Sequence, residues 1–158
     1  MSKRLLLIGP GSLGPSRAKS FPGFPDVTLA GVVPRSVASA DRAAAEFGIR
    51  VSGTSLEAVA EQAQPDAVVI ALVNAEHHAA IMWALQRDLD VFVEGPMVVN
   101  STQAQEVVDL ARERGRIVEV GFQRRYHPTI QRARELVQGG QYGPLVCSEV
   151  VWVWHLAP

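Results

Sequence analysis

The chain has 158 residues, a length that suits one domain with a single core better than two domains. Hydrophobic residues make up 47% and charged residues 20%, which is typical of a globular protein and excludes a disordered one. The net charge of -1 gives no basic excess, and no apolar run reaches the roughly 18 residues of a membrane helix, so we expect neither nucleic acid nor a membrane as partner.

Cysteine and histidine usage restricts the chemistry further. Cys147 is the single cysteine, which excludes an internal disulfide framework and a multi-cysteine metal site. His77 and His78 are adjacent and do not share a helical face, so we expect no metal site there. The apolar run 5–8 ends at Gly9 and is too short for a signal peptide. We therefore expect a cytoplasmic protein.

Short apolar or β-branched runs alternate with longer segments of helical pattern. Such continuous apolar runs are typical of strands that are buried on both faces. The predicted strands are 5–8, 27–33, 67–73, 91–93, 117–122 and 145–154. The predicted helices are 14–20, 36–47, 54–64, 75–87, 101–114 and 129–137. This alternation predicts an α/β fold, a doubly wound parallel sheet in three α/β/α layers, with the last strand as a C-terminal extra strand.

Several helix ends carry capping residues. Gly48 and Gly115 follow predicted helices and suit C-terminal caps. The sequence from Thr54 to Glu57 reads as a capping box, Asn74 is a candidate cap for the helix 75–87, and Asn100 is one for the helix 101–114.

The first predicted strand runs directly into a glycine-rich turn. Gly9, Gly11 and Gly14, with Ser12 and Leu13 between them, read G-x-G-x-x-G and open the first helix. In a dinucleotide site the first glycine permits a tight turn, the second lets a pyrophosphate approach the backbone, and the third lets the helix pack on the strand. The helix start then offers N–H groups to the phosphates. The position after the first strand favours this Rossmann-type interpretation over a purely structural turn.

The residues after the second strand bear on the choice of coenzyme. An NAD site places an acid there for the ribose hydroxyls, but Pro34 is followed by Arg35 and Ser36. Arg35 offers a planar fork to a 2′-phosphate and Ser36 a hydroxyl, which favours NADP over NAD. The alternative is a solvated arginine at a strand end.

Five segments in the same order resemble the Gfo/Idh/MocA (glucose–fructose oxidoreductase/inositol dehydrogenase) family. They are the glycine turn and the segments Pro65–His77, Val91–Pro96, Val120–Pro128 and Gly140–Leu145. The resemblance covers nearly the whole chain. It implies a Rossmann fold, NAD or NADP as cofactor, and hydride transfer to or from a sugar, cyclitol or similar hydroxylated substrate.

The resemblance also implies roles for particular residues around the nicotinamide. Leu72 and Val73 line the nicotinamide side of the cleft, although the family prefers proline where Val73 stands. Asn74 and His77 match the family's Pro-Asn-x-x-His near the ribose and nicotinamide. The remaining residues that this resemblance places at the cofactor are Glu94, Gly95 and Gln123.

The chain departs from the family pattern at Gly95. The family's lysine at this position polarises or protonates the substrate oxygen, and glycine has no side chain to do so. Loss of such a group typically lowers the rate about 10²- to 10⁴-fold. The catalytic residues therefore stay unknown, with Glu94 and His77 as weak candidates; for Glu94, hydrogen bonding to nearby backbone is the alternative. Arg124 and Arg125 are either a phosphate or substrate clamp or solvated charges.

The end of the chain raises the question of a second domain. Family members continue into a substrate-binding domain, whereas this sequence stops at Pro158. We assign 1–144 to the NAD(P)-binding domain and 145–158 to the start of a missing substrate domain or an oligomer contact. Trp152 and Trp154 share one face of the predicted last strand, which favours a homodimer through 145–155 over folding back onto the chain's own helices.

Three interpretations remain open. The chain is an NAD(P)-dependent oxidoreductase domain that works as an oligomer with a substrate site between chains, a non-catalytic nucleotide-binding sensor or partner subunit, or a fragment whose second domain was cut away or is encoded separately. Gly95 favours the second interpretation, and retention of Asn74, His77, Glu94 and Gln123 favours the first.

Overall fold

The computed structural model describes residues 2–9 and 23–151. The chain divides into two compact units, Met1–Gly121 and Phe122–Pro158. The predicted helix 14–20, the residues Gly11, Ser12, Leu13 and Gly14 of the glycine turn, and the tryptophans Trp152 and Trp154 lie outside the described residues.

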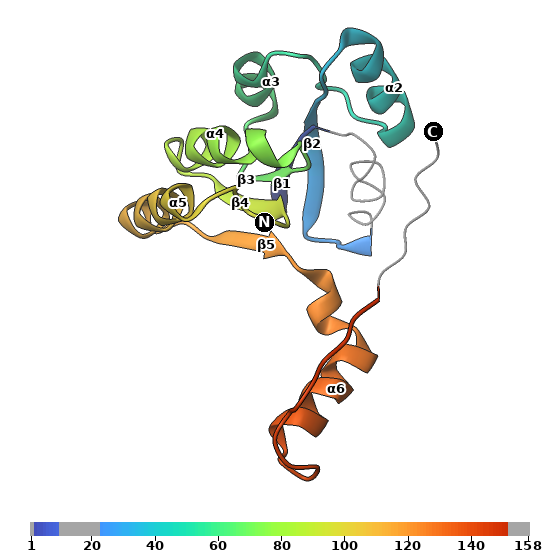
Figure 1. Cartoon of the computed structure of the whole chain (residues 1–158). Helices are drawn as coiled ribbons and strands as arrows, with labels where there is room; N and C mark the ends of the chain where they lie inside the picture. The colour runs from blue at the N-terminus through green and yellow to red at the C-terminus, as the bar shows by residue number, and fades with distance from the viewer. Residues whose placement is uncertain (1, 10–22, 152–158) are drawn as a thin grey trace. The chain divides into compact units, whose positions relative to one another are not determined.

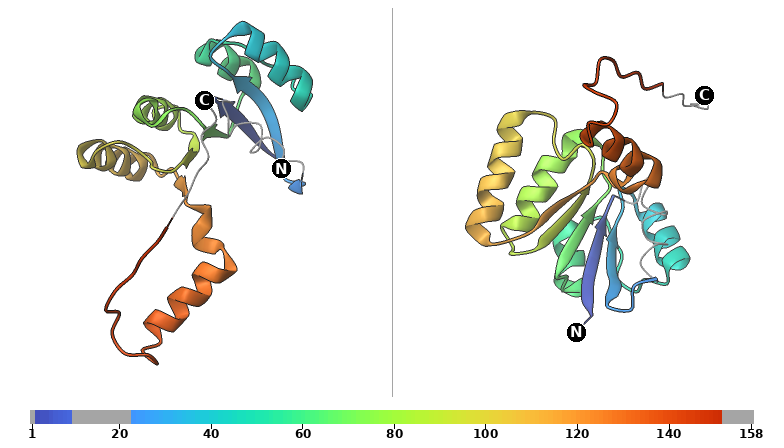
Figure 2. Two further views of the ribbon diagram at one scale, coloured as in Figure 1. Left: turned by 45° about the vertical axis from the view of Figure 1, so that its right-hand side comes forward. Right: turned by 90° about the horizontal axis from the view of Figure 1, so that it is seen from below.

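Unit 1 contains a five-stranded parallel sheet with the strand order β2-β1-β3-β4-β5, which confirms the predicted α/β class (Figure 1). The strands are β1 (Lys3–Ile8), β2 (Val27–Val33), β3 (Ala67–Ile70), β4 (Asp90–Glu94) and β5 (Val118–Gly121). The helices of this unit are α2 (Val37–Phe47), α3 (Leu56–Ala63), α4 (Asn74–Leu85) and α5 (Ser101–Arg114). The right-hand view of Figure 2 shows the strands side by side.

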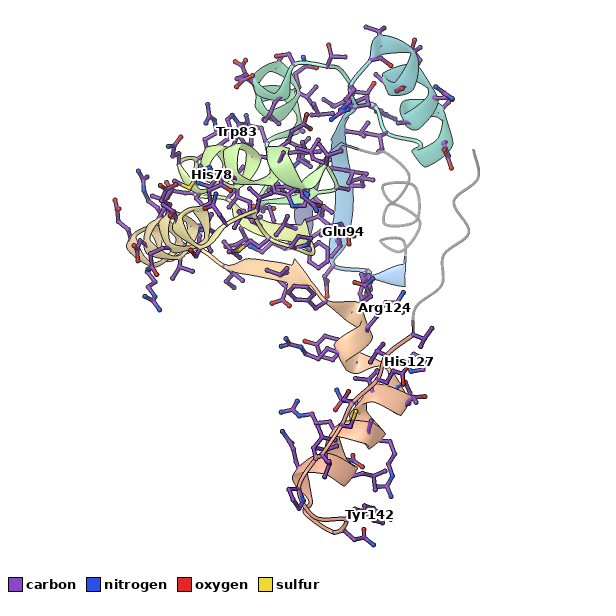
Figure 3. All side chains as sticks on the ribbon, viewed as in Figure 1. His78, Trp83, Glu94, Arg124, His127 and Tyr142 are labelled. Atoms are coloured by element: carbon purple, nitrogen blue, oxygen red, sulfur yellow. The ribbon has the colours of Figure 1, made fainter. Side chains whose placement is uncertain are left out.

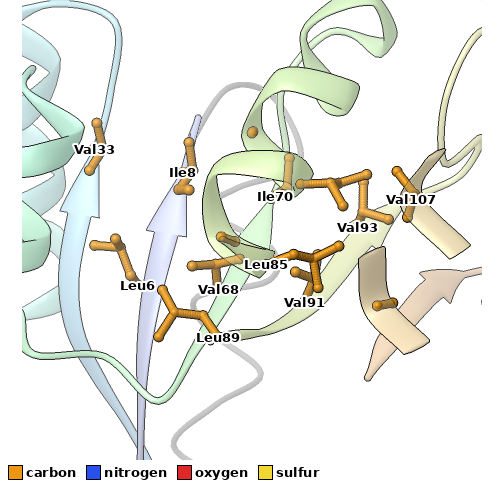
Figure 4. Close-up of a cluster of buried hydrophobic side chains, with 14 of the residues drawn as sticks. Leu6, Ile8, Val33, Val68, Ile70, Leu85, Leu89, Val91, Val93 and Val107 are labelled. Carbon is orange, nitrogen blue, oxygen red and sulfur yellow. The ribbon is translucent and has the colours of Figure 1, made fainter. Parts of the chain in front are cut away.

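Successive residues of a strand point to opposite sides of the sheet, and helices cover both sides. Leu6 and Val68 are paired across β1 and β3 and belong to a cluster with residues of α3, α4 and α5 (Figure 4). Their neighbours Leu7 and Val69 belong to a second cluster, which includes Ala43 of α2. Because both faces are buried, the central strands are continuous apolar runs in the sequence. The two clusters lie on opposite faces of the sheet, which gives three layers: helices, sheet and helices.

Local capping chemistry sets several helix ends. The side chain of Asn100 accepts a hydrogen bond of 2.9 Å from the N–H of Gln103, and α5 ends at Gly115, as predicted. In α3 the cap is Ser55, whose hydroxyl accepts from the N–H of Ala58, and not Thr54 as the capping box suggested. Either residue satisfies one of the free N–H groups at the helix start, so the sequence pattern alone misplaced the cap by one residue.

Unit 2 begins with the 3₁₀ helix η2 (Gln123–Tyr126) and continues into α6 (Pro128–Gln138). The predicted C-terminal extra strand is wrong for residues 145–151, which form no strand and are exposed. A strand needs a hydrogen-bonding neighbour, and in the described part of the chain none of the five sheet strands pairs with this segment. Cys147 lies in this segment and is exposed.

Candidate functional site

The strand order reverses between β1 and β3, and the carboxyl ends of these two strands lie together. The chain passes from β1 to β2 on one side and later adds β3 on the other. In open parallel sheets, ligands bind in the crevice at the carboxyl ends of the strands at such a reversal. Backbone hydrogen bonds hold the strand ends here: the N–H of Gly9 donates to Val33 (2.9 Å) and that of Ala71 to Ile8 (2.9 Å).

Gly9 is the residue that leaves β1 at this point, and its backbone requires glycine. Its φ is +72°, in the left-handed region. A Cβ at Gly9 would lie 2.4 Å from Cδ2 of Leu72 and 3.0 Å from the carbonyl oxygen of Ala71. The first glycine of the G-x-G-x-x-G motif therefore lets the turn after β1 lie directly against the segment that follows β3.

The segment between β3 and α4 brings three predicted site residues to the same edge. Leu72 packs partly against the core, whereas Val73 is 53% exposed. Val73 precedes α4 without a side-chain capping bond. Asn74 is the first residue of α4 and not its cap, because the helix starts one residue earlier than predicted; its side chain is exposed.

His77 lies in the first turns of α4 and is fully buried. Its Nδ1 is 2.9 Å from the carbonyl oxygen of Pro96, and its Nε2 is 3.1 Å from the carbonyl oxygen of Leu72. Carbonyl oxygens only accept hydrogen bonds and a neutral imidazole carries one N–H, so a neutral ring donates to one of these two carbonyls while its other nitrogen lies close to the second. The imidazole thus contacts both the loop after β3 and the loop after β4, the two loops that the family resemblance predicts to lie at the nicotinamide.

Glu94 ends β4 next to these loops (Figure 3). Its residue surface is only 7% exposed. Its carboxylate lies beside the end of β5, because a Cβ at Gly121 would be in ordinary contact with Oε2 of Glu94, at 3.4 Å. Gly95 follows and is exposed, and the peptide bond between Gly95 and Pro96 is cis.

Arg35 and Ser36, the residues predicted to meet a 2′-phosphate, are both engaged within the chain. Nη2 of Arg35 lies 2.8 Å from Oε1 of Glu76. The hydroxyl of Ser36 donates to the Ser39 hydroxyl (2.9 Å) and accepts from the Ser39 N–H (3.3 Å) at the start of α2. Glu76 played no part in the sequence analysis, because no motif links two residues that are 41 positions apart.

Gln123 belongs to unit 2, where it begins η2 and is exposed. Arg124 and Arg125 follow it in the same short helix and are also exposed. The structure thus brings Gly9, Leu72, Val73, Asn74, His77 and Glu94 together at the carboxyl edge of the unit 1 sheet.

The residues of this edge fit a pyridine nucleotide. The close approach of Gly9 to Leu72 provides a turn that a Cβ would block. Val73 offers an exposed apolar surface and Asn74 a polar one at the start of α4, where N–H groups point toward the edge. Within 2–9 and 23–151 no group of three or more His, Cys, Asp or Glu side chains could hold a metal ion.

Comparison with protein families agrees with this geometry. The Gfo/Idh/MocA family model, described as an oxidoreductase family with an NAD-binding Rossmann fold, matches residues 3–122. The chain belongs to this family. Its unit 1 is therefore the NAD-binding Rossmann domain of a Gfo/Idh/MocA protein, which confirms the predicted class of cofactor.

The relatives of this Gfo/Idh/MocA chain are longer proteins. The scyllo-inositol 2-dehydrogenase (NAD(+)) of Bacillus subtilis (strain 168) is 28% identical over 141 residues, covering 89% of this chain and 41% of that protein. The solved UDP-N-acetylglucosamine 3-dehydrogenase GnnA from Acidithiobacillus ferrooxidans has a TM-score of 0.76 and 29% identity, covering 86% of this chain and 43% of that one. GenD2 from gentamicin A biosynthesis, in complex with NAD, has a TM-score of 0.82 and 27% identity, covering 89% and 40%.

This Gfo/Idh/MocA chain thus spans between 40% and 43% of the length of these three relatives. In the described part of the chain, no helix combines the length and apolar character needed to cross a membrane.

Proposed function

We propose that this chain is the nucleotide-binding part of an NAD(P)-dependent dehydrogenase for a sugar, cyclitol or related polyol. The observation that carries the proposal is the packing of Gly9 against Leu72 at the strand-order reversal of a Gfo/Idh/MocA domain. The named relatives act on an inositol and on a nucleotide sugar, which supports this substrate class.

The bound nucleotide would supply the carbon that accepts or gives up hydride. The chain's own residues would bind and orient it. The turn at Gly9 lets the backbone approach the pyrophosphate, Val73 covers an apolar face, and the Asn74 side chain offers a hydrogen bond to the ribose. His77 holds the two loops at the nicotinamide in register through the carbonyl groups of Leu72 and Pro96.

Proton transfer is the step for which this edge has no obvious residue. Gly95 occupies the position of the family lysine, and it is exposed without a side chain. Glu94 is buried beside it, and a buried carboxylate is the candidate to take over part of that role. We therefore propose slow turnover, with a non-catalytic nucleotide-binding subunit as the second candidate function favoured by Gly95.

A matched pair of variants separates the two functions. The parent and Gly95→Lys would be screened with polyols, cyclitols and sugars plus NAD⁺ or NADP⁺, following the absorbance of the reduced coenzyme. We expect the lysine variant to exceed the parent by about 100-fold. Val99→Lys adds a lysine at an exposed position four residues later in the same loop and should leave the parent rate unchanged.

Three outcomes separate the candidates. Rapid turnover by the parent contradicts the non-catalytic subunit. Equal turnover in Gly95→Lys and Val99→Lys contradicts the assigned role of position 95. Absence of turnover in all three proteins contradicts the slow turnover proposed for this chain.

We also propose that the chain self-associates through the segment 145–151. This segment pairs with no strand among the described residues, yet it carries Leu145, Val146, Val150 and Val151, all largely exposed. Apolar side chains concentrated in so short a stretch are typical of a surface that is covered in an assembly.

A further inference from the structure

Arg35 and Glu76 form an ion pair at the end of the domain where the adenosine of a dinucleotide belongs. Arg35 follows the carboxyl end of β2, and Glu76 is the third residue of α4. Arg35 Nη2 and Glu76 Oε1 are 2.8 Å apart, and the two side chains are 65% and 47% exposed. The pair is thus accessible to a ligand on the surface of unit 1.

The end of β2 is the place where Rossmann domains distinguish NAD from NADP. An acid there holds the ribose hydroxyls of NAD, whereas an arginine accommodates the 2′-phosphate of NADP. The sequence 34–36 supplies no acid. The fold brings one from elsewhere, because the start of α4 places the Glu76 carboxylate against the Arg35 guanidinium.

We propose that Glu76 is a specificity-determining residue that disfavours NADP relative to NAD, an inference that rests on the proposed nucleotide site. The carboxylate occupies part of the guanidinium fork that would otherwise bind phosphate bidentately. It also adds a negative charge next to the position of the doubly charged 2′-phosphate. The 2′-hydroxyl of NAD meets neither obstacle and can donate a hydrogen bond to the same carboxylate.

The second residue predicted for a 2′-phosphate does not offset this effect. The Ser36 hydroxyl already bonds the hydroxyl and the N–H of Ser39 at the start of α2. Binding a phosphate through Ser36 would cost part of that helix cap. Both polar groups at the end of β2 are therefore engaged before a ligand arrives.

The test compares Glu76→Gln with the parent by titrating the full chain with NAD⁺ and NADP⁺ in a calorimeter at low ionic strength. Glutamine keeps the length of the side chain but removes its charge. We expect the affinity for NADP⁺ to rise about 10-fold, because one competing ion pair and one like charge are removed, while that for NAD⁺ changes less than about 2-fold. Glu135→Gln removes an equivalent carboxylate from the exposed pair with Arg132 (3.0 Å) in α6 and should change neither affinity.

A double variant shows whether the effect passes through Arg35. The gain for NADP⁺ between Arg35→Gln and Glu76→Gln/Arg35→Gln should be smaller than the gain between the parent and Glu76→Gln, because only the like charge is then removed; an equal gain would overturn the proposed competition for the guanidinium. An unchanged ratio of the two affinities in Glu76→Gln would overturn this inference alone, because the parent still binds a nucleotide. Failure of the parent to bind either coenzyme would overturn the nucleotide site and this inference with it.

Discussion

The buried ring of His77 lies 2.9 Å, at Nδ1, from the carbonyl oxygen of Pro96 in the loop after β4. The residues are 19 positions apart, and the same ring also reaches the carbonyl of Leu72 in the loop after β3. One side chain therefore contacts both of the loops that follow the neighbouring strands β3 and β4. This role is one of positioning, since both ring nitrogens point to backbone and the residue has no exposed surface.

Replacing His77 by alanine should destabilise the domain substantially. The change leaves a cavity and removes the contacts of the ring with the carbonyl groups of Leu72 and Pro96, which together cost about 2–4 kcal/mol. Urea denaturation followed by circular dichroism measures the free energy of unfolding. His78→Ala is the matched control: the adjacent histidine is only partly buried and pairs with Glu106 at 2.8 Å, so its loss should cost less than about 1 kcal/mol. Equal losses in the two variants would contradict the positioning role.

Gly9→Ala should destabilise the domain more than an alanine at another left-handed glycine. Gly48, at the end of α2, has φ +65° and open space where a Cβ would lie. Gly48→Ala should therefore lower the free energy of unfolding only through backbone strain, by about 1 kcal/mol. Gly9→Ala adds a clash with Leu72 and should cost about 1–3 kcal/mol more, as measured by thermal or urea denaturation.

A third variant locates the clash at Gly9. Combining Gly9→Ala with Leu72→Ala removes the atoms at 2.4 Å and 2.9 Å but leaves the Ala71 carbonyl oxygen at 3.0 Å. The double variant should therefore be more stable than the sum of the two single losses predicts. Strict additivity would contradict the packing of Gly9 on Leu72.

Features set by local chemistry could be predicted from the sequence. The cap at Asn100 and the helix end at Gly115 depend on a few neighbouring residues, and both are confirmed. The five sheet strands are likewise recognisable, because burial on both faces makes each an apolar run.

Features that depend on distant partners could not be predicted. The ion pair between Arg35 and Glu76 exists only because the sheet order brings the end of β2 near the start of α4. The apolar pattern of 145–151 resembles a strand, but a strand also needs a neighbour, and a sequence pattern does not supply one.

The self-association proposed for 145–151 predicts a concentration-dependent mass. Light scattering on a dilution series should show a dimer at micromolar concentration. Val146→Glu, at a side chain that is 93% exposed, should shift the equilibrium to the monomer by placing charges in the contact. Val99→Glu changes an exposed valine in unit 1 and should leave the mass unchanged. A monomer at all concentrations would contradict the proposal.

The nucleotide site at the carboxyl edge of the sheet is tested by calorimetric titration of the full chain with NAD⁺ and NADP⁺, with thermal unfolding measured in parallel. We expect saturable binding of at least one coenzyme at one site per chain and a higher unfolding temperature in its presence, because a ligand that binds only the folded state stabilises it. Absence of both heat and thermal protection with either coenzyme would contradict the existence of this site.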